Sequence, residues 1–383
     1  MTRIYLVRHA QAEGNLYRRA HGAYNSLITP QGYAQINALK ERFADIPVDV
    51  VYSSPRFRTR VTASAIYGPK DIPMYTMDDL REVDCGPWED RTWGDIRYYE
   101  GEQLDNFNYH FDQWHVDGAE TAEQVRDRML RVMDTIVREC PNMTVAAVSH
   151  GMASRILLGT LMGMSLKEIS ENFPHGDNTA VSLIEYENGQ YHVVFANDAS
   201  HLDQKISTFA NQTWWKGKDW EEVGLRFQTF DLQQDANAAL YQLCGAEAWQ
   251  SGHCSMEQYD SAAFLERARC AQRRYPGAVL AAYHKDQFAG FLQLDAEAGS
   301  GEGIGQVGFV YLTPEYRKRG VGIQLIGEMV SRYRSLKRKY IQLQCAKNNQ
   351  NALEFFLRSG FRKNGEAVAD AVDVDNLELY IGF

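Results

Sequence analysis

The sequence predicts an α/β protein built from two domains. The chain has 383 residues, more than a single hydrophobic core usually supports, so two cores are expected. In its first half, short apolar runs at residues 4–7, 48–52 and 144–148 are each followed by turn residues and then by helical periodicity. Strands that alternate with helices in this way indicate a largely parallel sheet. A second series of predicted helices and strands, in a different arrangement, begins at Leu225.

The helices and the final hairpin of the first domain follow from their periodicities. Residues 32–43 and 123–139 place apolar side chains three and four positions apart, as an amphipathic helix requires. Residues 180–186 and 191–196 alternate between apolar and polar, and the four residues between them are typical of a hairpin turn. We expect this hairpin to close the first domain, so that domain spans residues 1–204.

The remainder of the chain is predicted to form a connector and a second domain. Residues 205–222 contain Trp214, Trp215 and Trp220, a composition unlike a flexible linker, so this connector is expected to dock. The second domain, residues 223–383, is predicted to contain strands at 278–284, 288–294, 306–312 and 340–344 and helices at 320–334 and 351–358.

Composition and charge exclude several classes of protein. A hydrophobic share of 44% and a charged share of 23% predict a chain that folds throughout. The formal net charge of -10 argues against binding to nucleic acid or to a membrane surface. The six cysteines include no C-x-x-C pair, so neither a zinc site nor a disulfide framework is predicted. The apolar run near the N-terminus is too short for a signal peptide, and a cytoplasmic protein without a bound metal is expected.

Polar residues follow each of the three predicted strands of the first domain. Arg8 and His9 follow the first strand, Arg58 comes shortly after the second, and His150 and Gly151 follow the third. Because ligands of such sheets bind beyond the carboxyl ends of the strands, these residues should meet in one crevice. Two guanidinium groups and a helix N-terminus suit a phosphate. Neighbouring arginines also favour a neutral, nucleophilic histidine.

These residues also resemble a known family. Residues 1–204 resemble the histidine phosphatase superfamily, also called phosphoglycerate-mutase-like. Residues 6–10 resemble its R-H-G motif with Ala10 in place of glycine, and Asn15 stands where the family has a phosphate-contacting asparagine. Residues 52–63, 80–83 and 148–151 resemble its second arginine, acid and second histidine motifs. The resemblance implies a three-layer α/β/α domain.

The same resemblance implies roles for the residues and a class of substrate. His9 would form a phosphohistidine, and Glu82 would act in turn as general acid and general base. The phosphate oxygens would be held by Arg8, Asn15, Arg58, His150 and Gly151. The substrate would be a small phosphorylated metabolite.

Two questions about this domain stay open. The stretch 84–89 resembles the phosphatase branch, which favours hydrolysis, and a phosphoglycerate-type mutase is the alternative. The aromatic-rich stretch 93–114 is either a substrate lid or a stack of core aromatic side chains.

A basic, glycine-containing turn opens a predicted helix in the second domain. This turn consists of Arg317, Lys318, Arg319, Gly320, Val321 and Gly322. Glycines let the backbone approach an anion, and the N–H groups and the helix dipole favour a pyrophosphate there. The turn resembles the R-x-x-G-x-G motif of the GCN5-related N-acetyltransferase (GNAT) family. Residues 349–361 resemble its N-x-x-A motif with a following aromatic residue and G-F.

The GNAT resemblance covers residues 223–383 and implies an α+β domain with a mixed, mainly antiparallel sheet. Acetyl-CoA would be the cosubstrate and an amine the acceptor. Residues of three segments would bind acetyl-CoA: the turn 317–322, the strand end with Val310, Tyr311 and Leu312, and the helix with Asn349 and Phe356.

Phe356 departs from the family pattern, because active members place at this position a tyrosine that protonates the leaving thiolate. The second domain is therefore either an active transferase or a non-catalytic acetyl-CoA sensor. Tyr311 and Tyr316 are alternative proton donors, and Glu302 and Glu315 are candidates for the base. The sequence does not determine the oligomeric state.

Overall fold

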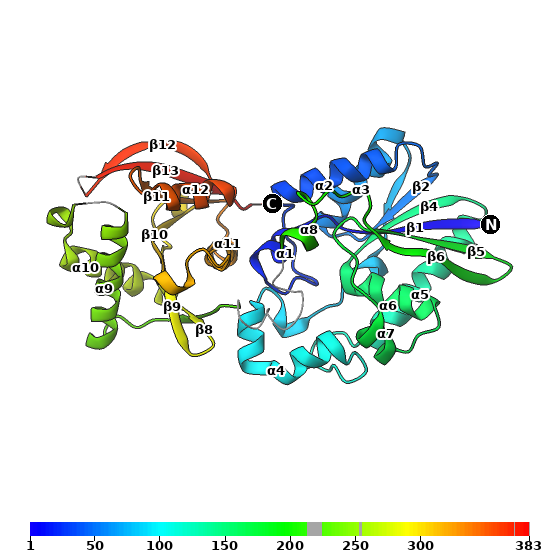
Figure 1. The fold of residues 1–383 in the computed structure, drawn as a ribbon, viewed down its shortest axis with the longest axis horizontal. Coiled ribbons are helices and arrows are strands. Elements are labelled where there is room, and N and C mark those ends of the chain that lie inside the picture. The colour runs from blue at the N-terminus through cyan, green and yellow to red at the C-terminus, as the bar shows by residue number, and fades with distance from the viewer. Residues whose placement is uncertain (213–223, 253–254, 371, 383) are drawn as a thin grey trace. The chain divides into compact units, whose positions relative to one another are not determined.

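The computed structural model describes residues 1–212, 224–252, 255–370 and 372–382. It divides into two compact units (Figure 1), an N-terminal unit of residues 1–91 and 96–220 and a C-terminal unit of residues 92–95 and 221–383. The domain limits at residues 204 and 223 stay a prediction. Trp214, Trp215 and Trp220 lie outside the described residues.

The N-terminal unit is built on a six-stranded sheet of order β3-β2-β4-β1-β5-β6. Strands β1 to β4 pair in parallel, and β5 and β6 are antiparallel additions at one edge. The bounds of the strands are β1 Thr2–Arg8, β2 Val50–Ser53, β3 Met74–Thr76, β4 Thr144–Ser149, β5 Val181–Glu187 and β6 Gln190–Asp198. The largely parallel sheet predicted from the sequence is confirmed, and β3 is an addition to it.

The hairpin between β5 and β6 is tighter than predicted. The strands pair as far as Glu187 and Gln190, so the turn contains only Asn188 and Gly189. These two residues have φ angles of 53° and 80°. Positive φ at both central positions is the conformation whose twist matches that of the flanking strands, which is why Asn-Gly favours it.

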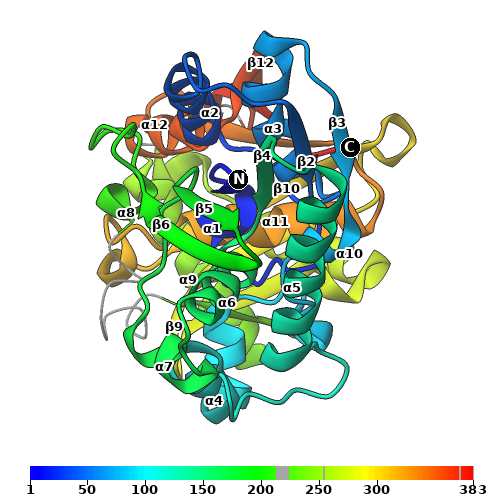
Figure 2. The same ribbon diagram turned by 90° about the vertical axis from the view of Figure 1, so that its right-hand side faces the viewer.

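Helices cover both faces of this sheet and make the three-layer unit that the resemblance implied. Helices α2 and α3 lie on one face, and α5 and α6 lie on the other (Figures 1 and 2). Thr29 starts α2 by accepting a hydrogen bond from Gly32 N, with Pro30 in the first helical position. The helices are α1 Glu13–Tyr17, α2 Pro30–Arg42, α3 Phe57–Lys70, α4 Trp93–Tyr109, α5 Ala122–Glu139, α6 Gly151–Leu161, α7 Leu166–Asn172 and α8 Thr208–Asn211.

The described part of the connector lies on the N-terminal unit. Nε2 of Gln35 donates to the carbonyl of Ile206 at 2.8 Å and to Oγ1 of Thr208 at 2.9 Å. The hydroxyl of Ser207 donates to Asp177 at 2.7 Å and also caps α8. Residues 205–212 are therefore held by hydrogen bonds from two segments of the sheet domain.

The C-terminal unit contains a seven-stranded sheet of order β12-β13-β11-β10-β9-β8-β7. Among the described strands of this unit only β10 and β11 pair in parallel, so the sheet is mixed and mainly antiparallel, as the resemblance implied. The strands are β7 Arg226–Thr229, β8 Val279–His284, β9 Gln287–Asp295, β10 Ile304–Leu312, β11 Tyr340–Ala346, β12 Arg362–Ala369 and β13 Val372–Tyr380.

Helices flank this second sheet on both faces. Helices α9 (Asp235–Ser251) and α10 (Ser261–Arg274) lie on one face, and α11 (Ile323–Ser335) and α12 (Gln350–Arg358) lie on the other (Figure 1). Buried Tyr241 and Leu265 of α9 and α10 pack with Phe291 of β9 in one core. The helix predicted at 320–334 begins later, at Ile323, because the preceding turn contains positive φ angles.

Within the described ranges, no helix is long and apolar enough to span a bilayer. The same ranges contain no cluster of His, Cys, Asp and Glu side chains that could hold a metal ion.

Candidate active sites

The backbone around His9 is fixed from three sides. Its N–H donates to the carbonyl of Ser149 at 3.0 Å, so β1 stays joined to β4 beyond the end of the sheet ladder. Its carbonyl accepts from Nδ2 of Asn178 at 2.9 Å, and the next N–H, that of Ala10, donates to Oγ1 of Thr62 at 2.9 Å. The imidazole, only 2% exposed, therefore stands on a rigid support.

The ring of His9 has a defined tautomer. Its Nδ1 lies 2.7 Å from the carbonyl oxygen of Ala10, and because a carbonyl can only accept, Nδ1 carries the hydrogen. The lone pair of the neutral ring is then on Nε2. Burial lowers the pKa of His9 well below its ordinary value, and the charges of Arg58 and Arg8 lower it further. The neutral form is the one that can attack phosphorus.

Arg58 brings the second histidine into the same cluster. Its Nε donates to Nδ1 of His150 at 3.2 Å, and Nε2 of His150 lies 2.9 Å from the hydroxyl of Ser54. The rings of His150 and His9 are edge to face, with centroids 5.2 Å apart. Burial lowers the pKa of His150, with Arg58 as the next cause, so His150 is neutral as well.

The terminal nitrogens of Arg58 hold a loop. They reach the carbonyls of His21 at 2.8 Å, Gly22 at 2.9 Å and Tyr24 at 2.9 Å. Burial lowers the pKa of Arg58 to about 10, and the carboxylates of Glu82 and Glu89 oppose this shift. Arg58 therefore joins the loop at residues 21–24 to the two histidines.

Arg8 lies beside the first residue of α6. Its Nη1 donates to the carbonyl of Gly176 at 2.5 Å, whereas its buried Nε has no hydrogen-bond partner among the residues that the structure describes. A Cβ at Gly151 would lie 3.2 Å from that Nε. Any side chain at this position would therefore displace the guanidinium group. A buried guanidinium group beside a helix N-terminus provides N–H donors and positive charge that suit an anion.

Glu82 lies at the same helix start. Its Oε2 accepts from Met152 N at 3.1 Å, and its Oε1 accepts from Ala153 N at 2.9 Å. Its charge raises the pKa values of Arg8 and Arg58 against the effect of burial, which places it near both guanidinium groups. The structure thus brings the residues predicted to act in catalysis into one cluster, while their roles stay predictions: His9, Glu82, His150, Arg8 and Arg58.

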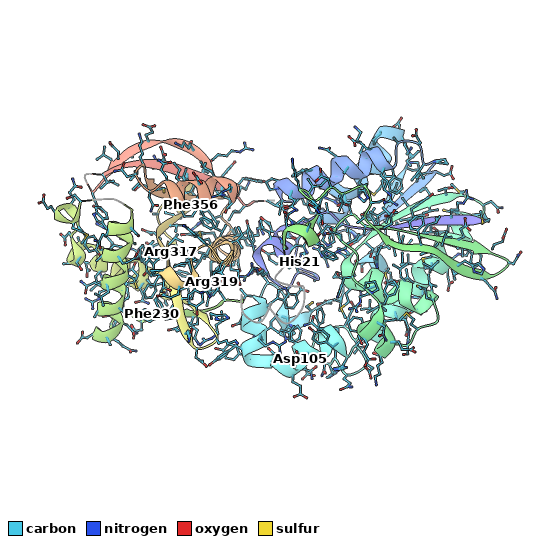
Figure 3. The ribbon with its side chains drawn as sticks, viewed as in Figure 1. His21, Asp105, Phe230, Arg317, Arg319 and Phe356 are labelled. Carbon is cyan, nitrogen blue, oxygen red and sulfur yellow. The ribbon has the colours of Figure 1, made fainter. Side chains whose placement is uncertain are left out.

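Asn15 reaches the cluster through a third histidine. Oδ1 of Asn15 accepts from Ala12 N at 3.1 Å, and Nδ2 lies 3.4 Å from Nε2 of His21. The His21 ring (labelled in Figure 3) is edge to face with that of His9, with centroids 5.8 Å apart. Burial, then Arg58 and Arg8, lower the pKa of His21.

Sequence reasoning missed His21 and Asn178 as parts of this site. A histidine twelve positions beyond His9, in the segment that follows the same strand, was a usable signal for His21. Asn178 carried no such signal, because its contact with His9 depends on the approach of a distant loop.

The aromatic stretch 93–114 has features of both proposed roles. Trp114 is 3% exposed and packs with Phe107 and Trp88 at centroid distances of 5.0 Å and 6.2 Å, as core side chains do. Tyr98, Tyr99 and Tyr109 are exposed. The stretch therefore consists of a buried aromatic cluster with exposed tyrosines, and its role as a lid stays a prediction.

In the C-terminal unit, β10 and β11 separate beyond a short parallel ladder. Their pairing runs from Ile304 with Tyr340 to Val307 with Leu343, while β10 itself continues to Leu312. On the other side, Val310, Tyr311 and Leu312 pair with β9. The edge of β10 that faces β11 is thus available for backbone hydrogen bonds with a ligand at the residues predicted to bind pantetheine.

The predicted pyrophosphate turn precedes α11. Lys318 and Gly320 have φ angles of 60° and 69°, and Gly322 is the N-cap of the 13-residue helix. Lys318, Arg319 and Gly320 are exposed, and Val321 is buried. This turn and helix start fit a pyrophosphate through backbone N–H groups and local positive charge.

The Arg317 side chain has another function in the structure (Figure 3). It forms a two-bond ion pair with Glu247 of α9, at 3.1 Å and 2.6 Å, and its Nε donates to the carbonyl of Leu312 at 2.8 Å. It thereby fixes the turn to α9, and it is the backbone of the turn that faces a ligand in our interpretation.

A cavity of about 800 Å³ connects the separated strands with α9 and α10. Among the predicted acetyl-CoA residues, Val310, Asn349 and Phe356 line it. Asn349 caps α12 by accepting from Ala352 N at 3.2 Å. Phe356 packs between Phe355 and Phe361 at centroid distances of 5.3 Å and 5.4 Å.

The alternative proton donors and bases are placed less favourably. The hydroxyl of Tyr316 donates to Gln287 at 3.1 Å, away from β11, and Tyr311 is buried over α9 with a pKa raised by burial. Glu302 and Glu315 are exposed and do not line the cavity as far as the described residues define it.

Comparison with known families supports the division seen in the fold. Residues 4–199 match the family model of the histidine phosphatase superfamily (branch 1), which is about half of the chain. Residues 232–361 match the model of the acetyltransferase (GNAT) family. The two families are thus fused in one chain.

Individual relatives match the N-terminal half. Phosphoserine phosphatase 1 of Hydrogenobacter thermophilus is 27% identical over 212 residues, covering 53% of this chain and 96% of the relative. A probable phosphoglycerate mutase of Erwinia tasmaniensis is 27% identical over 219 residues with the same two shares. The solved structure of Bacillus stearothermophilus YhfR has a TM-score of 0.52 and 28% identity, and the match covers 53% of this chain and 100% of YhfR.

Proposed function

We propose that this chain, which belongs to the histidine phosphatase superfamily (branch 1), hydrolyses a small phosphomonoester through a phosphohistidine on His9. The observation that carries the proposal is the tautomer of His9. Because Nδ1 donates to Ala10, the lone pair of Nε2 is available for attack within a cluster that contains two guanidinium groups.

The proposed reaction has two steps. Nε2 of His9 attacks phosphorus, the ester P–O bond breaks, and Glu82 transfers a proton to the departing alkoxide. Water then attacks the phosphohistidine, Glu82 takes its proton, and the N–P bond breaks to release phosphate. Arg8, Arg58, His150, Asn15 and the N–H of Gly151 hold the phosphoryl oxygens, whose negative charge the two arginines stabilise in the transition state.

The relatives suggest which substrate to try first. One is named a phosphoserine phosphatase and another a probable phosphoglycerate mutase, so phosphoserine and phosphoglycerate head a panel of phosphomonoesters. Release of inorganic phosphate together with a phosphorylated protein in intact-mass spectra is expected, with the phosphate on a peptide that contains His9. Conversion of one phosphoglycerate isomer into the other without free phosphate would instead support a mutase.

We further propose that the C-terminal unit transfers an acetyl group from acetyl-CoA to an amine. Support comes from the GNAT match, the separated strands β10 and β11, and the turn before α11. The turn would hold the pyrophosphate, and the β10 edge at Val310–Leu312 with Asn349 would hold the pantetheine arm. Bound acetyl-CoA supplies an activated thioester carbonyl, which the amine attacks once it has lost a proton.

Calorimetry and an acetylation assay test this second activity. The Gly320→Glu variant should lose acetyl-CoA binding, because a carboxylate side chain there repels pyrophosphate and strains a residue with φ of 69°. Acetyl transfer to members of an amine panel is expected in the wild type. Binding without transfer to any of them would favour the sensor alternative.

A further inference from the structure

The cavity of the C-terminal unit extends well beyond the residues proposed to hold the pantetheine arm. Five consecutive residues of β10, 306–310, line it. Since a strand rises about 3.3 Å per residue, this wall is about 13 Å long. Gln306 pairs with Asp295 of β9 at one end, and Val310 lies at the other end, toward the separated part of β10 and β11.

A continuous row of aromatic rings forms one side of this cavity. Trp249 of α9 lies next to Tyr259 with ring centroids 5.6 Å apart, Tyr259 lies 5.9 Å from Phe264, and Phe264 lies 5.0 Å from Phe309 of β10. All four rings line the cavity. We call these four residues the aromatic wall. Phe356 of α12 (Figure 3) lines the same cavity and adds a fifth ring.

Helix α10 contributes most of the charged side chains of the described lining. Ala263, Arg267, Cys270 and Arg274 line the cavity from one face of the helix, since they are spaced three and four residues apart. Arg267 pairs with Asp370 at 3.0 Å, and Arg274 pairs with Glu297 at 3.7 Å, in both cases with largely exposed side chains. The described lining also contains three carboxylates, those of Glu266, Asp295 and Asp370. Asp370 is neutralised by Arg267, and Glu266 pairs with Arg273 at 2.7 Å, so the lining does not offer the several unpaired carboxylates that a polyamine would need.

These features select among amines. Flat apolar groups gain dispersion and ring stacking against aromatic side chains, and an ammonium group is attracted to their faces. A flexible aliphatic chain gains less from such a surface, and a polycation leaves charges without partners. Val310, Asn349 and Phe356, which we call the reactive end, line the same cavity as the aromatic wall. A molecule that lies against the wall can therefore present its amino group near these three residues.

We propose that this cavity binds a primary amine carried on an aromatic body, with the ring against the aromatic wall and the amino group toward Phe356. The inference deepens the proposed acetyltransferase function and rests on it for the identity of the reactive end.

Calorimetry without acetyl-CoA tests the proposal with three probes on the full-length chain. Phenethylamine should bind about ten-fold more tightly than hexylamine, and spermidine should bind no more tightly than hexylamine. Trp249→Ala should weaken phenethylamine binding by about three- to ten-fold, the effect of one lost aromatic contact. Trp249→Phe should restore most of it. Leu243→Ala, at a residue 69% exposed on the same helix, is the matched control and should change nothing.

Equal affinities for phenethylamine and hexylamine, or an unchanged affinity in Trp249→Ala, would overturn the inference. Tighter binding of spermidine would replace it with a polyamine site. Failure of this inference is separable from failure of the transferase. Acetylation without preference for aromatic amines would leave the transferase standing alone, and selective binding of phenethylamine without acetylation would leave the binding site standing alone.

Discussion

The Nε–H of Arg58 donates to Nδ1 of His150 across 3.2 Å, between residues 92 positions apart in the chain. A nitrogen that accepts a hydrogen bond cannot carry a proton, so this contact holds His150 in its neutral form with the hydrogen on Nε2. The same guanidinium holds the loop at residues 21–24 through three carbonyls. Arg58 thus sets both the tautomer of one histidine and the position of another.

Arg58→Lys should lower kcat/KM for the phosphomonoester by about 100-fold. Losses of this size follow the removal of a preorganised hydrogen-bond donor that stabilises the charge of a transition state. Lysine keeps the charge but cannot form the planar set of hydrogen bonds to His150 and the loop. Steady-state kinetics measure this loss. Arg60→Lys, at an exposed position on the same helix, should leave kcat/KM unchanged. A wild-type kcat/KM in Arg58→Lys would mean that a positive charge at this position is sufficient for catalysis.

The pKa of His9 predicts how stability depends on pH. In the unfolded chain His9 binds a proton at about pH 6.5, whereas burial holds the folded pKa well below that value. Below about pH 6.5 the unfolded state therefore binds more protons, and stability falls as the pH falls, by at most about 1.4 kcal/mol per pH unit for this residue. The thermal-unfolding midpoint should accordingly fall less between pH 7 and pH 5 in His9→Asn than in the wild type. An equal or larger fall would contradict the assignment.

Glu82→Gln should separate proton transfer by Glu82 from phosphate binding by the other residues of the site. A glutamine can stay near Met152 and Ala153 but cannot transfer a proton to the alkoxide. With an alkyl phosphate the rate of phosphoenzyme formation should fall by about 100-fold or more, whereas p-nitrophenyl phosphate, whose leaving group needs no proton, should be affected far less. Rapid-quench measurement of the phosphoprotein gives both rates.

Glu89→Gln is the matched control for this experiment. Glu89 accepts from the N–H groups of Ala23, Tyr24 and Cys85, so it supports the loop and has no proposed part in proton transfer. Its loss should slow both substrates to the same degree. If Glu82→Gln also slowed both equally, Glu82 would be a structural residue and not the acid.

Gly151→Ala should displace the Arg8 guanidinium by a few tenths of an ångström, because the added Cβ would lie 3.2 Å from Nε. Phosphoenzyme formation should slow by about ten-fold, since a misplacement of 1 Å can cost about 100-fold. Gly68→Ala provides the control: a Cβ there meets nothing within 4 Å. That variant should keep full activity and be more stable by about 0.5–1 kcal/mol in denaturant unfolding. Equal activities of the two variants would show that Arg8 tolerates displacement.

Phe356→Tyr should raise the kcat of acetyl transfer by at least about ten-fold, because the new hydroxyl can protonate the leaving thiolate. Acetylation of an accepted amine, followed by release of free thiol, measures the change. Phe355→Tyr, one position away and outside the described cavity lining, should have no such effect. An unchanged kcat in Phe356→Tyr would show that thiolate departure needs no acid in this unit.

Much of the architecture could be predicted from local patterns. The apolar runs that became β1, β2 and β4 and the helical periodicity of α5 indicated a largely parallel sheet, because periodicity reflects which face of an element is buried. Strands β7, β12 and β13 were not predicted. β12 is exposed along most of its length and β7 over its second half, which leaves little hydrophobic signal. β13 is largely buried or half-buried, but Asp373, Asp375 and Asn376 interrupt its apolar residues.

The sequence by itself determined the two families and the identities of the residues that gather around a phosphate, because the types and order of residues such as Arg8, His9 and His150 are local information. Only the tertiary structure decided that Arg58 sets the tautomer of His150, that His21 and Asn178 adjoin His9, and that Trp249 and Phe309 line one cavity. Such contacts join segments that are distant in the chain, and they depend on strand register and loop packing, which no local pattern encodes.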